Sequence, residues 1–337
     1  MTNDPGTSRP DMIRTPVVDL RSGQTIDGCY TCSEVESTAD RNGKPFLRLR
    51  LRDATGDVKA IHFDPSDEAL GMTAGDIAVV FGTYSVHPQY GPQVQVRRLR
   101  QATPEEYDLS ELVPSSPIDA GELGERLHAL IDSVNDPQLR ALLERAFDGA
   151  REPGATFVVA PAAVRNHHAY RRGLLEHSLI VAECAADVAS RLGSVDRDIV
   201  VAGGLLHDMG KTQAYTAGGM LPMMTDVGRL HGEIVIGQSI VQRLIDELAD
   251  FPSDMALRLG HIIISHHGMR EKGSPAVPMT REAIIVHYCD DMTARIAAVD
   301  DAERATPPGE PWSSRIFMID APAYLGNREE TDSDSHE

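Results

Sequence analysis

Cysteine, tryptophan and long apolar runs are all scarce in this sequence of 337 residues. The four cysteines (Cys29, Cys32, Cys184, Cys289) are too few and too scattered to form a disulfide scaffold. No stretch approaches the roughly 20 apolar residues that a membrane helix needs. The opening residues MTNDPGTSRPDMIR lack the apolar centre of a secretory signal. We therefore expect a cytoplasmic chain in a reducing compartment, with no membrane partner.

Positive charge is also in short supply. The chain has 32 Lys and Arg against 51 Asp and Glu, a net charge of −19, whereas nucleic-acid-binding proteins usually carry a basic footprint. Part of the excess lies in residues 326–337, an acidic stretch that we predict to be disordered, as we do residues 1–14. Carboxylates around a metal would also be neutralised by the ion. Any nucleic acid must therefore be bound by a local patch.

Cys29 and Cys32 form an isolated CxxC. A structural zinc site needs a second pair of ligands, and none is nearby in the sequence. We therefore interpret both as ordinary strand residues, with metal or redox chemistry as the alternative.

Short strands dominate residues 15–103. The clearest is Phe46–Arg52, which alternates strictly and places Leu47, Leu49 and Leu51 on one face. Further strands are indicated at Val58–Phe63, Ala78–Tyr84 and Gln93–Leu99, separated by turn residues. About five short strands in under roughly a hundred residues predict a small β-barrel or sandwich.

The other face of the Phe46–Arg52 strand combines an aromatic ring with cations. Stacking rings and guanidinium groups suit a single nucleic-acid strand, so the predicted nucleic-acid-binding residues are Phe46, Arg48, Arg50, Arg52, Phe63 and Tyr90, with Tyr84 as a further candidate. The alternative is a solvated, salt-bridged sheet face on which Phe46 packs against the neighbouring domain.

A polar, proline-bearing segment at 104–119 is a predicted linker, and from Ala120 the apolar period becomes helical. Helices are indicated at Leu174–Leu192, Asp196–Leu206, Glu233–Leu248, Met255–Ser265 and Arg281–Val299. We predict an all-α bundle over 120–325, in which an exposed apolar helix face would allow oligomerisation.

Histidine is concentrated in this bundle, with nine of thirteen between His167 and His287. Such crowding favours a metal site over packing. The sharpest signal is His207-Asp208 in LLHDMGK, because an imidazole and a carboxylate side by side at a helix end can reach one ion, and the carboxylate can bridge two. His177 precedes this pair, and His266-His267 and Asp290 follow it.

This order of ligands, H…HD…HH…D, resembles the HD superfamily of metal-dependent phosphohydrolases, whose fold is an all-α bundle. The wider series YDLSELVPSSP, NHHAYRRGLLEHS, LLHDMGK, ISHHG, GSPAVPMTREA and VHYCDD, following an OB-like barrel, is similar to the YhaM-type 3′–5′ exoribonucleases. The resemblance extends from about Val17 to about Ala298. It implies an OB-like nucleic-acid-binding barrel fused to a helical HD domain.

The resemblance also implies roles for individual residues. His177, His207, Asp208 and Asp290 would hold one divalent ion, with Asp208 bridging to a second held by His266 and His267. Lys211 would hold a substrate phosphate, and His168 or Arg172 could help. The family favours manganese. The residues alone are compatible with Mn, Fe, Co or Zn, one or two ions per chain.

One position departs from the family pattern. Family members carry a histidine ligand where this chain has Glu233, and His231 lies two residues earlier. Two residues correspond to about 200° around a helix, so both cannot take the same role. Either Glu233 replaces the histidine, or His231 reaches in from the helix start, or the second site is weakened.

Three functions compete at this point. The first is a metal-dependent 3′–5′ exonuclease that cleaves single-stranded RNA, or single-stranded DNA, with a metal-activated water. The second is an HD-type phosphohydrolase of small nucleotides, which the barrel disfavours. The third is a non-catalytic nucleic-acid-binding protein, which the intact ligand set disfavours.

Overall fold

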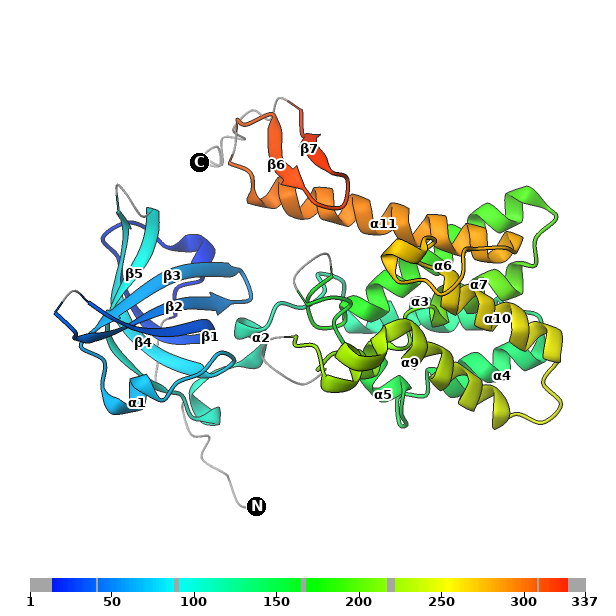
Figure 1. The fold of residues 1–337 in the computed structure, drawn as a ribbon, viewed down its shortest axis with the longest axis horizontal. Helices are drawn as coiled ribbons and strands as arrows, with labels where there is room; N and C mark the ends of the chain where they lie inside the picture. Colours follow the sequence, from blue (N-terminus) through cyan, green and yellow to red (C-terminus); the bar gives the residue numbers. More distant parts are fainter. Residues whose placement is uncertain are drawn as a thin grey trace, which may run out of the picture. The chain divides into compact units, whose positions relative to one another are not determined.

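The computed structural model describes residues 14–40, 42–87, 91–164, 168–216, 222–307 and 309–326 (Figure 1). The predicted disordered ends therefore lie outside the described residues except for Arg14 and Gly326, and so do Tyr90 and His167. The chain forms two compact units, with the boundary after Ser115.

The first unit is a closed five-stranded barrel, drawn blue to cyan in Figure 1. Its strands are β1 (Thr25–Ala39), β2 (Pro45–Asp53), β3 (Gly56–Phe63), β4 (Ile77–His87) and β5 (Gly91–Gln101). They close in the order β1-β2-β3-β5-β4, and only the β3–β5 pairing is parallel. A short helix, α1 (Asp67–Leu70), joins β3 to β4. This is the OB arrangement, which confirms the predicted small barrel.

The barrel core follows from the alternation of β2. Leu47, Leu49 and Leu51 are buried against Ile26, Tyr30, Val80, Val94 and Val96 from the other strands. Cys29 and Cys32 are both buried on β1, and burial raises their thiol pKa values to about 11 and about 12. A thiol held in the protonated form is a poor nucleophile at neutral pH. Both residues lie in strand β1, as predicted, and belong to different apolar clusters, Cys32 with the barrel core and Cys29 with Ile77 and Leu112.

A buried carboxylate closes the β2–β3 turn. Asp53 is fully buried and accepts hydrogen bonds from the backbone N–H groups of Val17, Thr55 and Gly56 at 2.8, 2.7 and 3.1 Å. Its Oδ2 also pairs with the Arg14 guanidinium at 2.6 Å. Asp53 thereby ties Arg14 and the short 3₁₀ helix Val17–Asp19 to the barrel.

Most of the predicted linker belongs to the barrel unit. Residues 104–112 contain a 3₁₀ turn (Pro104–Glu106) and α2 (Leu109–Leu112). Leu112 is buried beside Cys29 and Ile77, and the Ala54 N–H donates to the Glu111 carbonyl at 2.9 Å. The structure thus differs from the predicted boundaries, because Leu112, with Tyr107 packed on the same cluster, docks this segment on the barrel.

The second unit is a helical bundle, drawn green to orange in Figure 1. Its helices are α3 (Ala120–Asp132), α4 (Pro137–Ala146), α5 (Gly154–Phe157), α6 (Gly173–Leu192), α7 (Arg197–Leu206), α8 (Lys211–Ala214), α9 (Asp226–Asp246), α10 (Ser253–Ser265) and α11 (Arg281–Ala305). Apolar residues at helical spacing form one core, which includes Leu174, Leu179, Leu205 and Ile263. Among the described helices, none is long and apolar enough to cross a membrane.

The prediction that residues 120–325 are entirely helical was wrong at the C-terminal end. Strands β6 (Trp312–Ile316) and β7 (Ala321–Tyr324) form an antiparallel hairpin after α11. Ser313, Ile316 and Ala323 are its buried residues. Strands this short carry too little alternation to be distinguished from a loop by sequence pattern.

Candidate metal centre

Four helices bring the predicted ligands together. His177 lies in the second turn of α6, and His207-Asp208 follow directly on the buried end of α7. His266-His267 follow the end of α10, and Asp290 lies on α11. The His207-Asp208 and His266-His267 pairs each directly follow the last residue of a helix. Their side chains converge on the same buried region as His177 and Asp290.

The first group of donor atoms is compact. Ligand atoms of His177, His207 and Asp290 all lie within 4.8 Å of one another. His177 Nε2 is 3.1 Å from Asp290 Oδ1, and His207 Nε2 is 3.3 Å from Asp208 Oδ2. Asp208 Oδ2 is also 3.6 Å from His177 Nε2. Two nitrogens and two carboxylates facing one point form a donor set for a divalent transition metal.

Asp208 also faces a second group. Its other oxygen, Oδ1, is 3.6 Å from His266 Nε2. The His266 and His267 rings are 4.2 Å apart, and His267 Nε2 is 3.7 Å from Glu233 Oε1. The two oxygens of Asp208 thus point to two neighbouring sets of donors.

Backbone carbonyls fix the histidine tautomers. The Nδ1 atoms of His207, His266 and His267 lie 2.7, 2.7 and 3.1 Å from the carbonyls of Gly204, Ile263 and Lys272. Because a carbonyl only accepts, each Nδ1 carries the hydrogen and each Nε2 presents a lone pair. Such outer hydrogen bonds are how proteins orient histidine ligands toward a metal.

Burial and neighbouring charges set the ionisation of this centre. Burial, followed by the nearby His267 and His207 rings, lowers the pKa of His266 to about 3, so this ring is neutral at pH 7. Burial disfavours ionised Asp208, but Lys211 and His207 outweigh it and hold the pKa of Asp208 well below its usual range. His266 therefore offers a neutral imidazole and Asp208 an ionised carboxylate, the forms that bind metal. At His207, burial is outweighed by Asp208 and Asp290, which raise its pKa, so a metal ion bound there would displace a proton.

A metal ion fits these residues. His207 Nε2, Asp208 Oδ1 and His266 Nε2 are buried and have no hydrogen-bond partner within the described part of the chain. Buried polar atoms without a partner cost free energy. Three that converge, each presenting a lone pair, are explained by bound cations.

The structure distinguishes the environments of Glu233 and His231. Gly232 has a left-handed φ of 74° that breaks α9 between them. The Glu233 side chain is mostly buried and reaches His267, whereas His231 is exposed. Gly210, next to Lys211, packs on this break so closely that an added Cβ would lie 1.9 Å from the Glu233 carbonyl.

Lys211 lies at the centre, where its Nζ is 2.7 Å from Asp208 Oδ2. His168 lies at the edge of the centre, where the centroid of its ring is 5.6 Å from that of the His177 ring. Two residues that the sequence analysis missed hold His168. Its Nδ1 is 2.8 Å from the Tyr170 hydroxyl, which donates to Glu176 at 3.0 Å. Both occur in the NHHAYRRGLLEHS stretch, which was the available signal.

Two further residues lie outside the donor groups. Arg172 lines a separate pocket with Arg171 and Leu175. His287 supports the centre from outside, since its Nδ1 is 2.6 Å from the His266 carbonyl.

On the barrel, aromatic and charged side chains share the outer face of β2 and β3. Phe46 and Phe63 have ring centroids 5.6 Å apart, and the Arg48 guanidinium lies 5.6 Å from the Phe46 centroid. Arg50 pairs with Asp57 and with Glu34, while Arg48 makes a looser pair with Glu36 at 3.7 Å. The face therefore combines features of both sequence interpretations: stacked rings and salt bridges.

Comparison with known proteins identifies both parts of the chain. The HD domain family matches residues 174–295, which span the ligands from His177 to Asp290. The chain is 32% identical over 302 residues to the 3′-5′ exoribonuclease YhaM of Bacillus velezensis, covering 88% of this chain and 93% of that one. It is 33% identical to the Bacillus licheniformis protein of the same name, over 83% and 87% of the two chains.

Among solved structures, the second OB-fold domain of replication protein A from Methanococcus maripaludis matches at 17% identity, with a TM-score of 0.22. That match covers 26% of this chain and 94% of the other, and a score this low supports no structural conclusion. The sequence relatives are decisive, because they span the barrel, the HD ligands and the segment between them. The chain therefore belongs to the YhaM family of 3′–5′ exoribonucleases, with an OB-type barrel followed by a divalent-metal-dependent HD domain.

Proposed function

We propose that this protein removes nucleotides from the 3′ end of single-stranded RNA by metal-dependent hydrolysis, in the cytoplasm. The observation that carries the proposal is the convergence of His177, His207, Asp208 and Asp290 within the HD domain. The relatives named as exoribonucleases match through the barrel as well. A small-nucleotide phosphohydrolase would have no use for the barrel.

We assign the ligands to two neighbouring ions. His177, His207, Asp290 and Asp208 Oδ2 would hold the first, and Asp208 Oδ1, His266, His267 and Glu233 the second. Mixed imidazole and carboxylate ligands suit Mn²⁺, with Fe, Co or Zn as alternatives. Divalent ions bound here supply a nucleophile at neutral pH and offset the charge of the scissile phosphate.

The remaining residues bind and orient the substrate. The Lys211 ammonium stands 2.7 Å from Asp208, where it can also reach a phosphate oxygen beside the ions. Burial opposes its charge, but Asp208 raises the pKa of Lys211, so it stays cationic. His168 is held in place by Tyr170 and Glu176. Because its Nδ1–H is used on the Tyr170 oxygen, His168 would donate to the same phosphate from Nε2 as an imidazolium. Arg172 lines a separate pocket and has no role at the ions in this assignment.

The choice between Glu233 and His231 can be tested by metal binding. We expect Glu233→Ala to weaken the second Mn²⁺ site by about 10–100-fold, the range seen when metal-site partners are removed. His231→Ala is the matched control and should leave both sites unchanged, because His231 is exposed. Calorimetric Mn²⁺ titration of the two variants measures the difference. The opposite pattern would transfer the role to His231.

The barrel would hold the incoming strand on the β2–β3 face. Bases stacking on Phe46 and Phe63 contribute about 1–3 kcal/mol each, and Arg48 and Arg52 would attract the backbone. Arg50 is already paired with Asp57 and Glu34, so Arg50→Gln should matter less than Phe46→Ala. Fluorescence anisotropy with labelled single-stranded RNA in EDTA separates binding from hydrolysis. Equal affinities for wild type and Phe46→Ala would remove this face from the strand path.

The deciding experiment is degradation of 3′- and 5′-labelled single-stranded RNA and DNA, first with EDTA and then with Mn²⁺ restored. Shortening from the 3′ end only after Mn²⁺ is added would support the proposal. The ratio of RNA to DNA rates would define the substrate. Strand binding without cleavage under any metal would overturn it.

A further inference from the structure

A groove in the helical unit lies apart from the metal ligands and is unused by the mechanism above. It has a volume of about 640 Å³, within the roughly 300–1,000 Å³ of small-molecule sites. Its walls come from α3, the end of α4, residues 147–149, the 158–159 turn and the start of α6. None of the proposed ion ligands lines it.

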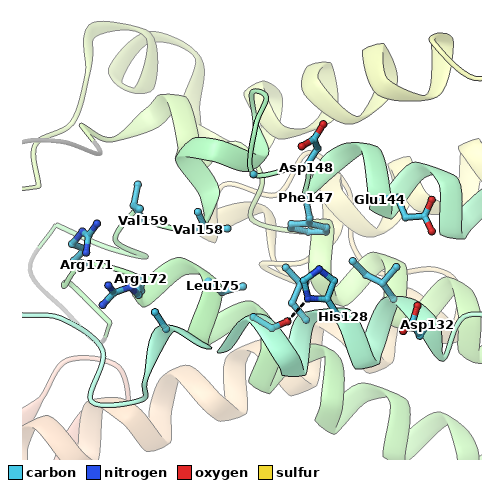
Figure 2. Close-up of a pocket in the computed structure, with 15 residues that line it drawn as sticks. His128, Asp132, Glu144, Phe147, Asp148, Val158, Val159, Arg171, Arg172 and Leu175 are labelled. Carbon is cyan, nitrogen blue, oxygen red and sulfur yellow. Dashed lines mark hydrogen bonds between the residues drawn. The ribbon is translucent and has the colours of Figure 1, made fainter. Parts of the chain in front are cut away.

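The groove has a cationic end. Arg171 and Arg172 stand together on one side in Figure 2. Neither guanidinium is in an ion pair with any described residue, whereas Arg126, which lies on α3, pairs with Glu183. In a chain with a net charge of −19, two adjacent unpaired cations facing a groove form a local anion site.

The middle of the groove is apolar, and the far end is acidic. Phe147 and Leu175 lie between the arginines and the carboxylates of Asp132 and Glu144 (Figure 2). Neither carboxylate is in an ion pair within the described ranges. The His128 ring stands in the middle as well, and because its Nδ1 donates to the Gly124 carbonyl at 2.8 Å, its Nε2 is an acceptor.

A ligand that matches this order has an anion, a flat apolar body and hydrogen-bond donors. A nucleoside monophosphate has all three: phosphate for the guanidinium pair, a base for the apolar wall, and base amino groups for His128, Asp132 and Glu144. We propose that this groove binds one nucleoside monophosphate unit, outside the metal centre. The unit would be either a free mononucleotide or one nucleotide of an RNA strand. The inference rests on the proposed function for the source of such ligands.

The acidic end adds a preference among bases. Adenine, cytosine and guanine carry exocyclic amino donors, whereas uracil has no amino group and flanks its single N3–H donor with two carbonyl acceptors, which the carboxylates would repel. We therefore expect AMP, CMP and GMP to bind more tightly than UMP. Glu144→Gln should reduce that difference, since an amide no longer selects a donor.

The test is calorimetric titration of AMP and UMP into full-length protein in EDTA, which keeps ions out of the metal centre. Wild type should bind AMP, and the double variant Arg171→Gln/Arg172→Gln should lose at least about tenfold in affinity, as expected for charge-assisted hydrogen bonds. Arg191→Gln, an exposed arginine at the other end of α6, is the matched control and should bind like wild type. Adenosine should bind the wild type and the double variant equally.

A parallel titration with a six-nucleotide oligoadenylate in EDTA identifies the source. Loss of both AMP and oligoadenylate affinity in the double variant indicates a strand unit, and loss of AMP alone indicates a free mononucleotide. Either result supports the groove. No AMP binding by wild type, or equal affinity in the double variant, overturns it.

The two proposals fail separately. A protein that degrades RNA but does not bind AMP in EDTA would refute the groove alone. One that binds AMP through Arg171 and Arg172 but never cleaves RNA would refute the exonuclease alone.

Discussion

Each unit buries an aspartate, and the two carboxylates differ in how completely they are hydrogen-bonded. Asp53 in the barrel is fully buried, and both oxygens are satisfied by backbone N–H groups and by Arg14. Asp208 in the bundle is almost as deeply buried, yet its Oδ1 has no hydrogen-bond partner among the described residues and faces His266.

Whether a buried carboxylate has all its hydrogen bonds therefore distinguishes a structural aspartate from a functional one better than its degree of burial does. A satisfied carboxylate stabilises the fold, because its desolvation is offset by charge-assisted hydrogen bonds. A buried carboxylate oxygen without a hydrogen bond, next to other buried lone-pair atoms that also lack one, lowers the stability of the ligand-free protein. Such a cluster persists because binding a cation supplies the missing interactions.

The largest effect should come from Asp208→Asn, which removes the charge shared by both donor groups. Hydrolysis of 3′-labelled RNA should fall by about 10³-fold or more, the upper range for loss of one electrostatic element of an active site. Circular dichroism should show an intact fold, and RNA affinity in EDTA should match wild type. Turnover at the wild-type rate would exclude Asp208 from the metal centre.

Asp53→Asn is the matched substitution in the barrel. Its new amide N–H₂ would face the Val17 N–H and Arg14, so buried donors would meet donors. Breaking a buried pair costs about 3–5 kcal/mol. Hydrogen exchange should accelerate in β1 and β2 peptides, and urea denaturation should give the lost free energy. Stabilisation by Mn²⁺ should be retained. Its loss would show that the contrast between the two carboxylates is false.

Metal binding should stabilise the bundle in wild type. Mn²⁺ at 100 times its Kd should add about 2.7 kcal/mol, because it binds the folded state only. Thermal unfolding with Mn²⁺ and with EDTA measures the shift, and Trp312 fluorescence reports on the helical unit, which contains the only tryptophan. His207→Ala should abolish most of the shift. A shift of equal size in that variant would place the ion elsewhere.

Local pattern predicted much of this architecture. The strict alternation at 46–52 gave the buried Leu47, Leu49 and Leu51, and helical spacing gave the bundle. The His-Asp and His-His pairs at helix ends gave side chains that converge at the candidate metal centre. The same alternation along β3 places His62 on the inward face, with Val58 and Ala60. It is buried and hydrogen-bonded to the Val96 carbonyl at 3.1 Å.

What the pattern could not give depends on contacts between distant residues. Arg14 meets Asp53 only after the barrel closes, and Leu112 docks the predicted linker through Cys29 and Ile77. The position of Glu233 depends on the left-handed Gly232 that interrupts α9. The sequence could not show that Arg172 lines a pocket with residues of α3 and α4 and not with the proposed ion ligands, because that depends on how these helices pack.

The smallest effect concerns a satisfied carboxylate that is partly exposed, with a side chain 20% accessible. Glu106 makes a two-pronged pair with Arg100 and caps the Thr103 N–H. The hydrogen bond from Arg100, followed by that from Thr103, lowers the pKa of Glu106 from 4.5 to about 2. Because the folded pKa is depressed, the stabilisation is complete above the unfolded value and is lost as pH falls from 4.5 toward about 2.

Solvent screening limits this contribution to less than about 1 kcal/mol. Glu106→Gln should therefore reduce the free energy of unfolding by that amount at pH 7, and the gap to wild type should shrink as the medium becomes more acidic. Urea denaturation at a series of pH values measures it, with the exposed neighbour Glu105→Gln as control. A gap that stays constant down to the acid limit would mean that Glu106 acts through shape rather than charge. Of Asp53 and Glu106, only the buried Asp53 would then need its charge to stabilise the barrel. The contrast with Asp208 would therefore hold for carboxylates that are buried as well as fully hydrogen-bonded.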